Sequence, residues 1–442
     1  MTEGYEQFRS RALAELAKGD ARAAFSAIRP ALEYPASFED ELHFRDAFSI
    51  FARIAAFLAE PEFVELVNAV VKGADDPQAL YDLGYQLIEL GTPRIAAVVL
   101  NRANELAPGM EVILTELVCA FEESGLFADA VRVLHEVPEI LEESFICRYL
   151  LAFNKLMLCN VEAARKILPS LQADADLDHK FMCDQLQGFL LRADVVSGVS
   201  PLDEGDLRGW HFVMNGALLL HLSPWGFDEG MHGRYAYTQD SASRCLEAIK
   251  RLKHVFEAME TKPPRVLMLK DRGSEILARA AAAALGLPLV EWQLGLDLPG
   301  LIPVYDLREL EPETIEALSV HRKQQILWCH ASCWTEQQPF AADIVSYLYQ
   351  YNCSPWSSRP TADAACQKIV KCAAQEGSAE DLSREITGVS LEEDTLDDVD
   401  ELKSLVVRSR LLTGQAAAGV FIEEGRRQRQ FLQSPVRSGR FV

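Results

Sequence analysis

A 34-residue repeat in the first half of the chain restricts its fold more than any other feature. The clearest unit runs from Pro77 to Met110, and its apolar positions are Leu80, Leu83, Leu87, Ala96, Leu100 and Ala103. Steps of 34 residues reach two further sets: Leu114, Leu117, Phe121, Ala130 and Leu134, then Arg148, Leu151, Lys155, Ala164 and Leu168. One helix pair cannot bury its apolar face alone, so neighbouring pairs must stack. The repeat therefore predicts a superhelix of helix pairs.

The spacing resembles the tetratricopeptide repeat family, on the Leu83-Gly84 pair, a small residue where the helices cross, and Pro108 in the closing turn. Earlier units fall at 5–38 and 39–72, and 181–194 fits a capping helix. The resemblance implies a repeat domain over 1–195 whose first helices line a peptide-binding groove. In the family's register this groove is lined by Tyr81, Tyr85, Glu89, Thr115, Cys119, Glu122, Tyr149 and Phe153. The alternative is that the aromatic residues among them only pack between repeats.

A chain of 442 residues exceeds the usual size of one hydrophobic core. We therefore expect further domains at 208–358 and 361–442, after a glycine-rich linker near 195–208. The net charge of −23 argues against nucleic acid and anionic lipid as partners. Ten cysteines without a CxxC pair fit a reducing compartment, and the absence of a signal peptide or long apolar segment predicts a cytoplasmic protein.

The segment 208–358 alternates between strand and helix patterns. Strands are expected at 211–222, 234–238, 265–270, 287–293, 301–307 and 324–330, and helices at 241–260, 271–286, 312–321 and 339–351. Such alternation is typical of a three-layer α/β domain with a mostly parallel sheet. The predicted fold class is therefore an α plus α/β multidomain protein.

Two segments of this domain, 266–292 and 326–350, resemble the phosphoribosyltransferases. In that family an acidic pair follows the second strand, where this chain has Cys329 and His330. The resemblance implies a degenerate domain that has lost the family's catalysis. It also implies an anion site at Arg272, Gly273 and Ser274, with Ser332 and Thr335 in the phosphate loop. The alternative for Ser274 is a capping role at the start of the helix.

Two clusters are candidates for catalysis. Cys329 and His330, with Cys333 nearby, lie at the carboxyl end of a predicted strand, where α/β sheets place ligand sites. Asp228, Glu229, His232 and Arg234 share a glycine-flanked loop that suits acid-base chemistry. The alternatives are buried thiols that pack and a solvated hairpin. No metal site and no cofactor are predicted, because zinc-type CxxC pairs are missing.

The final segment begins with a helical pattern at 366–375 and an acidic stretch at 391–401, followed by predicted helices at 398–413 and 415–430. Its last part, 425–442, has five arginines and no acidic residue. This basic tail is a candidate for docking on an acidic surface, including self-association between chains. The alternative is a disordered end.

The strongest pattern in the chain is thus a binding scaffold. The predicted function is a protein-protein interaction scaffold or adaptor that binds a peptide or partner protein, and the chain is expected not to be an enzyme. The alternative is an enzyme or sensor that binds a phosphorylated or nucleotide-like small molecule in the α/β domain.

Overall fold

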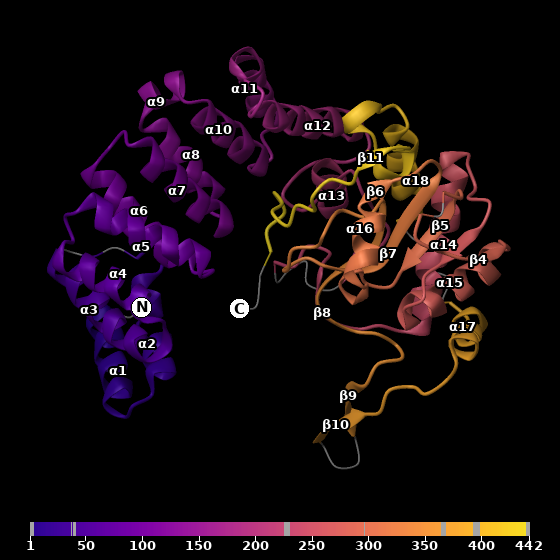
Figure 1. Ribbon diagram of the computed structural model, residues 1–442, viewed down its shortest axis with the longest axis horizontal. Coiled ribbons are helices and arrows are strands. Elements are labelled where there is room, and N and C mark those ends of the chain that lie inside the picture. The colour runs from indigo at the N-terminus through magenta and orange to yellow at the C-terminus, as the bar shows by residue number, and fades with distance from the viewer. Residues whose placement is uncertain are drawn as a thin grey trace. The chain divides into compact units, whose positions relative to one another are not determined.

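The chain folds into two compact units, Met1–Cys183 (the repeat unit) and Asp184–Val442 (the sheet unit). The computed structural model describes residues 4–36, 38, 41–224, 230–295, 297–363, 368–391 and 398–438 (Figure 1). This division differs from the three predicted segments, because the helix α12 (Lys180–Val196) runs across the boundary and the final segment packs onto the sheet unit. Among the described residues, no helix has the length and apolar character needed to cross a bilayer.

The repeat unit consists of helices that pack against their neighbours along the chain. They are α1 (Tyr5–Ala17), α2 (Ala21–Leu32), α3 (Glu41–Leu58), α4 (Pro61–Lys72), α5 (Pro77–Glu89), α6 (Pro93–Leu106), α7 (Glu111–Glu123), α8 (Phe127–His135), α9 (Pro138–Glu143), α10 (Phe145–Met157) and α11 (Val161–Asp174). The helices α5, α7 and α10 begin 34 residues apart, as do α6, α8 and α11. The predicted helical repeat is confirmed, and one continuous core runs through it.

Local sequence signals explain where these helices start and how closely they pack. At α5 the Asp76 carboxylate caps the helix by accepting from the Gln78 N–H at 3.0 Å, and Pro77 takes the first helical position, where no amide hydrogen is needed. Gly84 lies where α5 crosses α6, and a Cβ there would be 2.4 Å from Leu100 Cγ. Only glycine therefore permits this close approach of the two helices.

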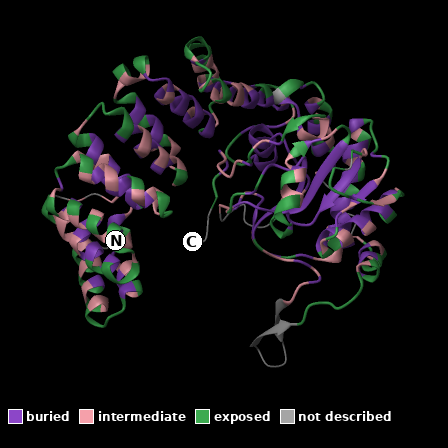
Figure 2. Ribbon diagram, viewed as in Figure 1, coloured by how far each residue is buried: buried purple, intermediate pink, exposed green. Residues whose placement is uncertain are grey.

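The sheet unit contains a parallel sheet. Its strands are β1 (Leu218–Leu219), β2 (Tyr235–Gln239), β3 (Val266–Met268), β4 (Leu289–Glu291), β5 (Gly300–Val304), β7 (Gln325–Cys333) and β8 (Ile344–Cys353). The order is β1-β8-β7-β5-β3-β4, with β2 beside β8 as well, and every pairing is parallel. Figure 2 shows that the central strands are buried throughout. The predicted α/β class of this unit is confirmed.

Helices and short elements surround the sheet. They are α13 (Leu207–Asn215), α14 (Ala242–Met259), α15 (Arg272–Leu285), α16 (Pro312–Leu318), α17 (Ala379–Gly388), α18 (Val399–Ser409), the 3-10 turns η1 (Leu307–Glu309), η3 (Gly414–Ala416) and η4 (Gly419–Phe421), and the hairpin pairs β9 (Arg359–Asp363) with β10 (Lys368–Cys372) and β6 (Val320–His321) with β11 (Gly425–Arg426). The helices α14, α15, α17 and α18 pack together. The chain turns in opposite directions after β3 and after β5, so their carboxyl ends form a topological switch point.

Four predicted elements are wrong. The segment 211–222 is not one strand, because α13 is capped by Asp206 and stops at Gly216, which has φ 61°. The segment 339–351 is the strand β8 instead of a helix: its β-branched and aromatic residues are buried in mid-sheet, where strands read as continuous apolar runs. The segments 366–375 and 415–430 hold β10 and short turns instead of helices, because β10 pairs with β9 and β11 pairs with β6. Most of the acidic stretch, 392–397, lies outside the described residues.

The basic tail packs on its own sheet unit as far as residue 438. Arg427 is 7% exposed, donates from Nε to the Leu318 carbonyl at 2.9 Å and forms an ion pair with Asp343. Further along, Phe431 packs edge to face on Phe189 at 5.1 Å. The described part of the tail is therefore not a disordered end, and its partner is a carboxylate of the same chain. Self-association stays a prediction.

Candidate functional site

The predicted groove residues lie on the first helices of three successive pairs, α5, α7 and α10. We call the surface made by these helices the first-helix face, and its members are Tyr81, Tyr85, Glu89, Thr115, Glu116, Cys119, Glu122, Tyr149 and Phe153. The three helices are neighbours in space, since α7 contacts both α5 and α10. The repeat thus brings side chains from residues 81 to 153 onto one surface, although their binding role stays a prediction.

The two ends of this face differ in exposure. Tyr85 is 46% exposed, and its ring lies 6.5 Å from that of Tyr81. Tyr149 and Phe153 are stacked on each other at 6.4 Å and are only 8% and 6% exposed. The aromatic residues on α10 therefore serve packing, whereas those on α5 remain available to a partner.

Carboxylates between these aromatic pairs lack cationic partners. Burial raises the pKa of Glu122 to about 7, although its carboxylate accepts from Asn154 Nδ2 at 2.5 Å. Burial, together with the nearby Glu89 carboxylate, also raises the pKa of Glu116. Among the described residues, none of these three acids forms an ion pair. Half-buried acids without a cation cost folding free energy, so this arrangement needs another explanation than stability.

This cost gives the repeat unit a characteristic pH dependence. Between pH 4.5 and about 7 the folded Glu122 still holds a proton that the unfolded chain has lost, so stability falls as the pH rises through this range. The loss is at most about 3 kcal/mol. We expect Glu122→Gln to abolish this part of the fall and to raise the stability at pH 7.5 by about 1–3 kcal/mol. Urea unfolding followed by far-UV circular dichroism at several pH values measures it, and a wild-type profile unchanged by the substitution would contradict it.

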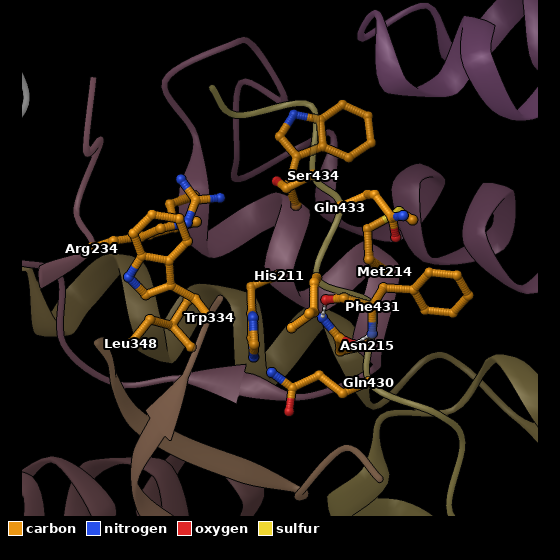
Figure 3. Close-up of a pocket in the computed structure, with 13 residues that line it drawn as sticks. His211, Met214, Asn215, Arg234, Trp334, Leu348, Gln430, Phe431, Gln433 and Ser434 are labelled. Carbon is orange, nitrogen blue, oxygen red and sulfur yellow. Dashed lines mark hydrogen bonds between the residues drawn. The ribbon is translucent and has the colours of Figure 1, made fainter. Parts of the chain in front are cut away.

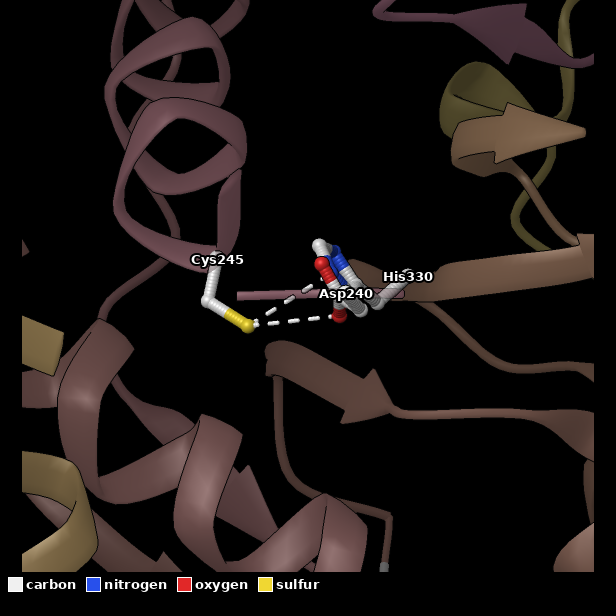
Figure 4. Close-up of side chains that lie close together, drawn as sticks. All are labelled: Asp240, Cys245 and His330. Carbon is white, nitrogen blue, oxygen red and sulfur yellow. Dashed lines mark hydrogen bonds and ion pairs between the residues drawn. The ribbon is translucent and has the colours of Figure 1, made fainter. Parts of the chain in front are cut away.

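The second candidate lies at the carboxyl edge of the sheet. Asp240 follows β2, Cys245 lies in the first turn of α14, and His330 is near the end of β7. The Asp240 Oδ2 atom is 3.1 Å from His330 Nε2 and 3.6 Å from Cys245 Sγ, and the sulfur is 3.6 Å from the same ring nitrogen (Figure 4). All three residues are buried.

Aromatic and amide side chains complete this cluster. Tyr305 donates its hydroxyl hydrogen to Asp240 Oδ2 at 3.0 Å and accepts from Asn352 Nδ2 at 3.1 Å. Burial alone would raise the pKa of Asp240, but the interactions with His330 and then Arg244 outweigh it and lower the pKa. Burial raises the pKa of the Cys245 thiol well above its usual value. The thiol is therefore protonated when no other group binds it, and it is not an exposed nucleophile.

The predicted anion site is engaged by the protein itself. The exposed Arg272 donates from Nη2 to the carbonyls of Gln375 and Gly377 at 2.5 and 3.1 Å. The Ser274 hydroxyl accepts from the Tyr305 N–H at 3.0 Å, while Asp271 caps the helix by accepting from the Ser274 N–H at 2.9 Å. A Cβ on Gly273 would lie 3.3 Å from a Glu309 carboxylate oxygen. The switch point is therefore acidic.

The remaining predicted residues do not come together. Cys329 and Ser332 are buried within β7, so the expected phosphate loop is strand here, and Thr335 lies just beyond it. Asp228 and Glu229 lie outside the described residues. His232 is half-buried in a turn at φ 45°. Of the predicted catalytic residues that the structure describes, only His330 joins the buried cluster. The catalytic and ligand roles stay predictions.

A cavity lies where the tail crosses α13. His211, Arg234 and Trp334 line it together with residues 430–434 (Figure 3). Its volume of about 20 Å³ is room for one water molecule. Burial, with the nearby Arg234, lowers the pKa of His211 to about 4, so the imidazole is neutral at physiological pH. This cavity is too small for a substrate.

Comparisons with known proteins add little to this geometry. No protein-family model matches the chain, and no curated protein is similar to it. One solved structure that is similar is a tetratricopeptide repeat protein from Parabacteroides merdae ATCC 43184, at 14% identity over 43% of this chain and 86% of that one, with a TM-score of 0.25. Such a TM-score is too low to define a shared fold. The comparisons give no support to the phosphoribosyltransferase resemblance.

The sequence interpretation missed Asp240 and Cys245. A signal was present, because Asp240 directly follows a correctly predicted strand and Ser241 begins a helix by accepting from the Arg244 N–H at 3.2 Å. The carboxyl ends of parallel strands meet at one edge, so residues following the strands at 235–239 and 325–333 belong together. The wrong assignment of β8 hid the order of the strands and with it this neighbourhood.

Proposed function

We propose that the repeat unit binds a peptide or protein segment that carries both basic and apolar side chains, as a tetratricopeptide-like scaffold. The observation that carries this proposal is the set of unpaired carboxylates beside accessible aromatic rings on the first-helix face. Lysine or arginine would compensate the acids, and an apolar side chain would cover Tyr81 and Tyr85. Such a ligand would offset the cost that Glu122 imposes on the unbound fold.

The position of each group suggests how a ligand would lie. The acids of α7 stand between the exposed tyrosines of α5 and the buried aromatic pair of α10. A cationic side chain would contact Glu116 and Glu122, while its apolar neighbour packs on Tyr85. Aromatic residues commonly provide the main energy of an interface, and charges fix its register. The sheet unit then acts as an attached domain within a cytoplasmic adaptor.

Peptides that differ in one property at a time test this proposal. We expect saturable binding, by fluorescence anisotropy with the full chain, of short peptides containing lysine and leucine. Peptides with glutamate in place of lysine are expected not to bind. Tyr85→Ala should weaken the binding about 10-fold, which corresponds to about 1.4 kcal/mol. Affinity should rise between pH 6 and 8 as Glu122 ionises, and Glu122→Gln should remove that rise.

Glu65→Gln is the matched control, because Glu65 is an exposed acid on α4, outside the first-helix face. It removes one charge and should leave the affinity within about 2-fold, since exposed surface charges contribute less than about 1 kcal/mol. Equal binding of acidic and basic peptides would contradict the proposal. So would a Tyr85→Ala variant with unchanged affinity.

A further inference from the structure

The buried cluster at the carboxyl edge of the sheet has the dimensions of a metal site. In a tetrahedral zinc site, bonds of about 2.0–2.3 Å place the ligand atoms about 3.3–3.6 Å apart. The three separations among Asp240 Oδ2, Cys245 Sγ and His330 Nε2 are 3.1, 3.6 and 3.6 Å. One carboxylate oxygen, one sulfur and one imidazole nitrogen therefore form a triangle of the size that one ion would span.

We propose that Asp240, Cys245 and His330 bind a single Zn²⁺ ion through these three atoms. The ligand types support this choice, because Zn²⁺ accepts thiolate, imidazole and carboxylate together, whereas Ca²⁺ and Mg²⁺ prefer oxygen alone. Three protein ligands leave the fourth tetrahedral position to a water molecule. The proposal goes beyond peptide binding by the repeat unit and does not depend on it. It also departs from the sequence prediction of no metal.

The surroundings of Asp240 hold it ready to act as a ligand. Its second oxygen, Oδ1, accepts from the Ser241 N–H at 2.8 Å, which fixes the carboxylate plane and leaves Oδ2 directed at the cluster. Tyr305 donates to Oδ2 at 3.0 Å and is itself held by Asn352. Hydrogen-bonded outer residues of this kind are typical of zinc sites.

His330 can meet the requirement for a neutral ligand. Binding through Nε2 leaves the ring proton on Nδ1, which is buried and has no hydrogen-bond partner among the described residues. The rings of Trp328 and Tyr347 pack edge to face with the imidazole at 5.9 and 5.2 Å and fix its orientation. The ring therefore cannot turn freely away from the other two ligand atoms.

Charge and protons balance in the proposed complex. The Cys245 thiol loses its proton to solvent when the Zn–S bond forms, so thiolate and carboxylate together neutralise the two charges of the ion. A net neutral group is the form that a buried site tolerates best. Access is short, since Arg244, whose side chain is 24% exposed, lies 3.9 Å from Asp240. Affinity should therefore fall at acidic pH, where the proton competes with the metal.

Metal content and spectroscopy test the proposal with the full chain. We expect about one Zn²⁺ per chain after dialysis, measured by mass spectrometry of the metal. The Co²⁺-loaded protein should show thiolate-to-cobalt charge transfer and the intense visible bands of tetrahedral cobalt. The nearly isosteric variants Cys245→Ser and Asp240→Asn should weaken the affinity for Zn²⁺ by more than about 100-fold in chelator competition, since even outer residues cost about 10–100-fold.

Cys333→Ala is the matched control, because Cys333 is a second buried thiol of β7 whose sulfur is outside the triangle. It should retain the stoichiometry and the cobalt spectrum. Near-ultraviolet circular dichroism of each variant without metal shows that the sheet unit is folded. Bound zinc that survives Cys245→Ser in a folded protein would overturn the proposal. Absence of the thiolate band in the cobalt-loaded wild-type protein would overturn it as well.

Discussion

Replacing Arg427 by methionine is expected to destabilise the sheet unit by about 3–5 kcal/mol, the cost of leaving a buried charge without its partner. Its guanidinium is 2% exposed and pairs with Asp343, whose side chain is 1% exposed. Methionine has a similar volume but can neither pair with the carboxylate nor donate to the Leu318 carbonyl. All six tryptophans belong to the sheet unit, so urea unfolding followed by tryptophan fluorescence reports on this unit alone.

Two further variants isolate the buried pair. Arg426→Met changes the neighbouring arginine, whose ion pair with Glu316 is 70% and 75% exposed, and it should cost less than about 0.5 kcal/mol. Asp343→Asn in the Arg427→Met background removes the orphaned charge and should recover more than half of the loss. The amide oxygen can still accept from the Leu327 N–H, which is 2.7 Å from Asp343 Oδ2. Equal effects of Arg426→Met and Arg427→Met would contradict this account of the tail.

Replacing Gly84 by leucine is expected to destabilise the repeat unit by more than about 3 kcal/mol, the upper end of the range for overpacked cores. Even a Cβ at this position would lie 2.4 and 2.6 Å from two carbons of Leu100, which is fully buried. The two helices would have to move apart and lose contacts with both neighbouring pairs. The change should appear as a lower urea midpoint by far-UV circular dichroism, with the tryptophan transition unchanged.

Gln86→Leu provides the control for Gly84→Leu, because it adds a leucine to the same helix at a position without a close neighbour. It should change stability by less than about 0.5 kcal/mol. Adding Leu100→Ala to Gly84→Leu makes room at the crossing and should restore part of the stability. A Gly84→Leu protein as stable as the wild type would show that the crossing is not tightly packed.

The repeat unit could be predicted well because its signal is local. Helix starts 34 residues apart follow from apolar positions such as Leu83, Leu117 and Leu151, which repeat with the helical period. The sheet unit was harder, since strands buried on both faces lose the alternation that marks a strand. The run Ile344–Cys353 therefore fitted a helix pattern equally well, and only its pairing with β1, β2 and β7 makes it a strand.

The candidate sites show the same limit. Tyr81, Tyr85 and Glu122 follow from the repeat register alone, because each lies at a fixed place on a first helix. The cluster of Asp240 and His330 joins residues 90 apart in sequence, and only the order of the strands makes them neighbours. Residue types indicated His330, but its partners depend on non-local pairing, which no motif in this chain encodes.

The tail also has a consequence for how the protein is made. Arg427 follows its partner Asp343 by 84 residues, so a ribosome adding about 5–20 residues per second leaves the carboxylate without its cation for about 4–17 seconds. The repeat unit consists of contacts between helices adjacent in sequence and can form while synthesis continues. The sheet unit cannot complete its core until the tail has emerged. During that interval the nascent sheet is the part of the chain most in need of chaperones.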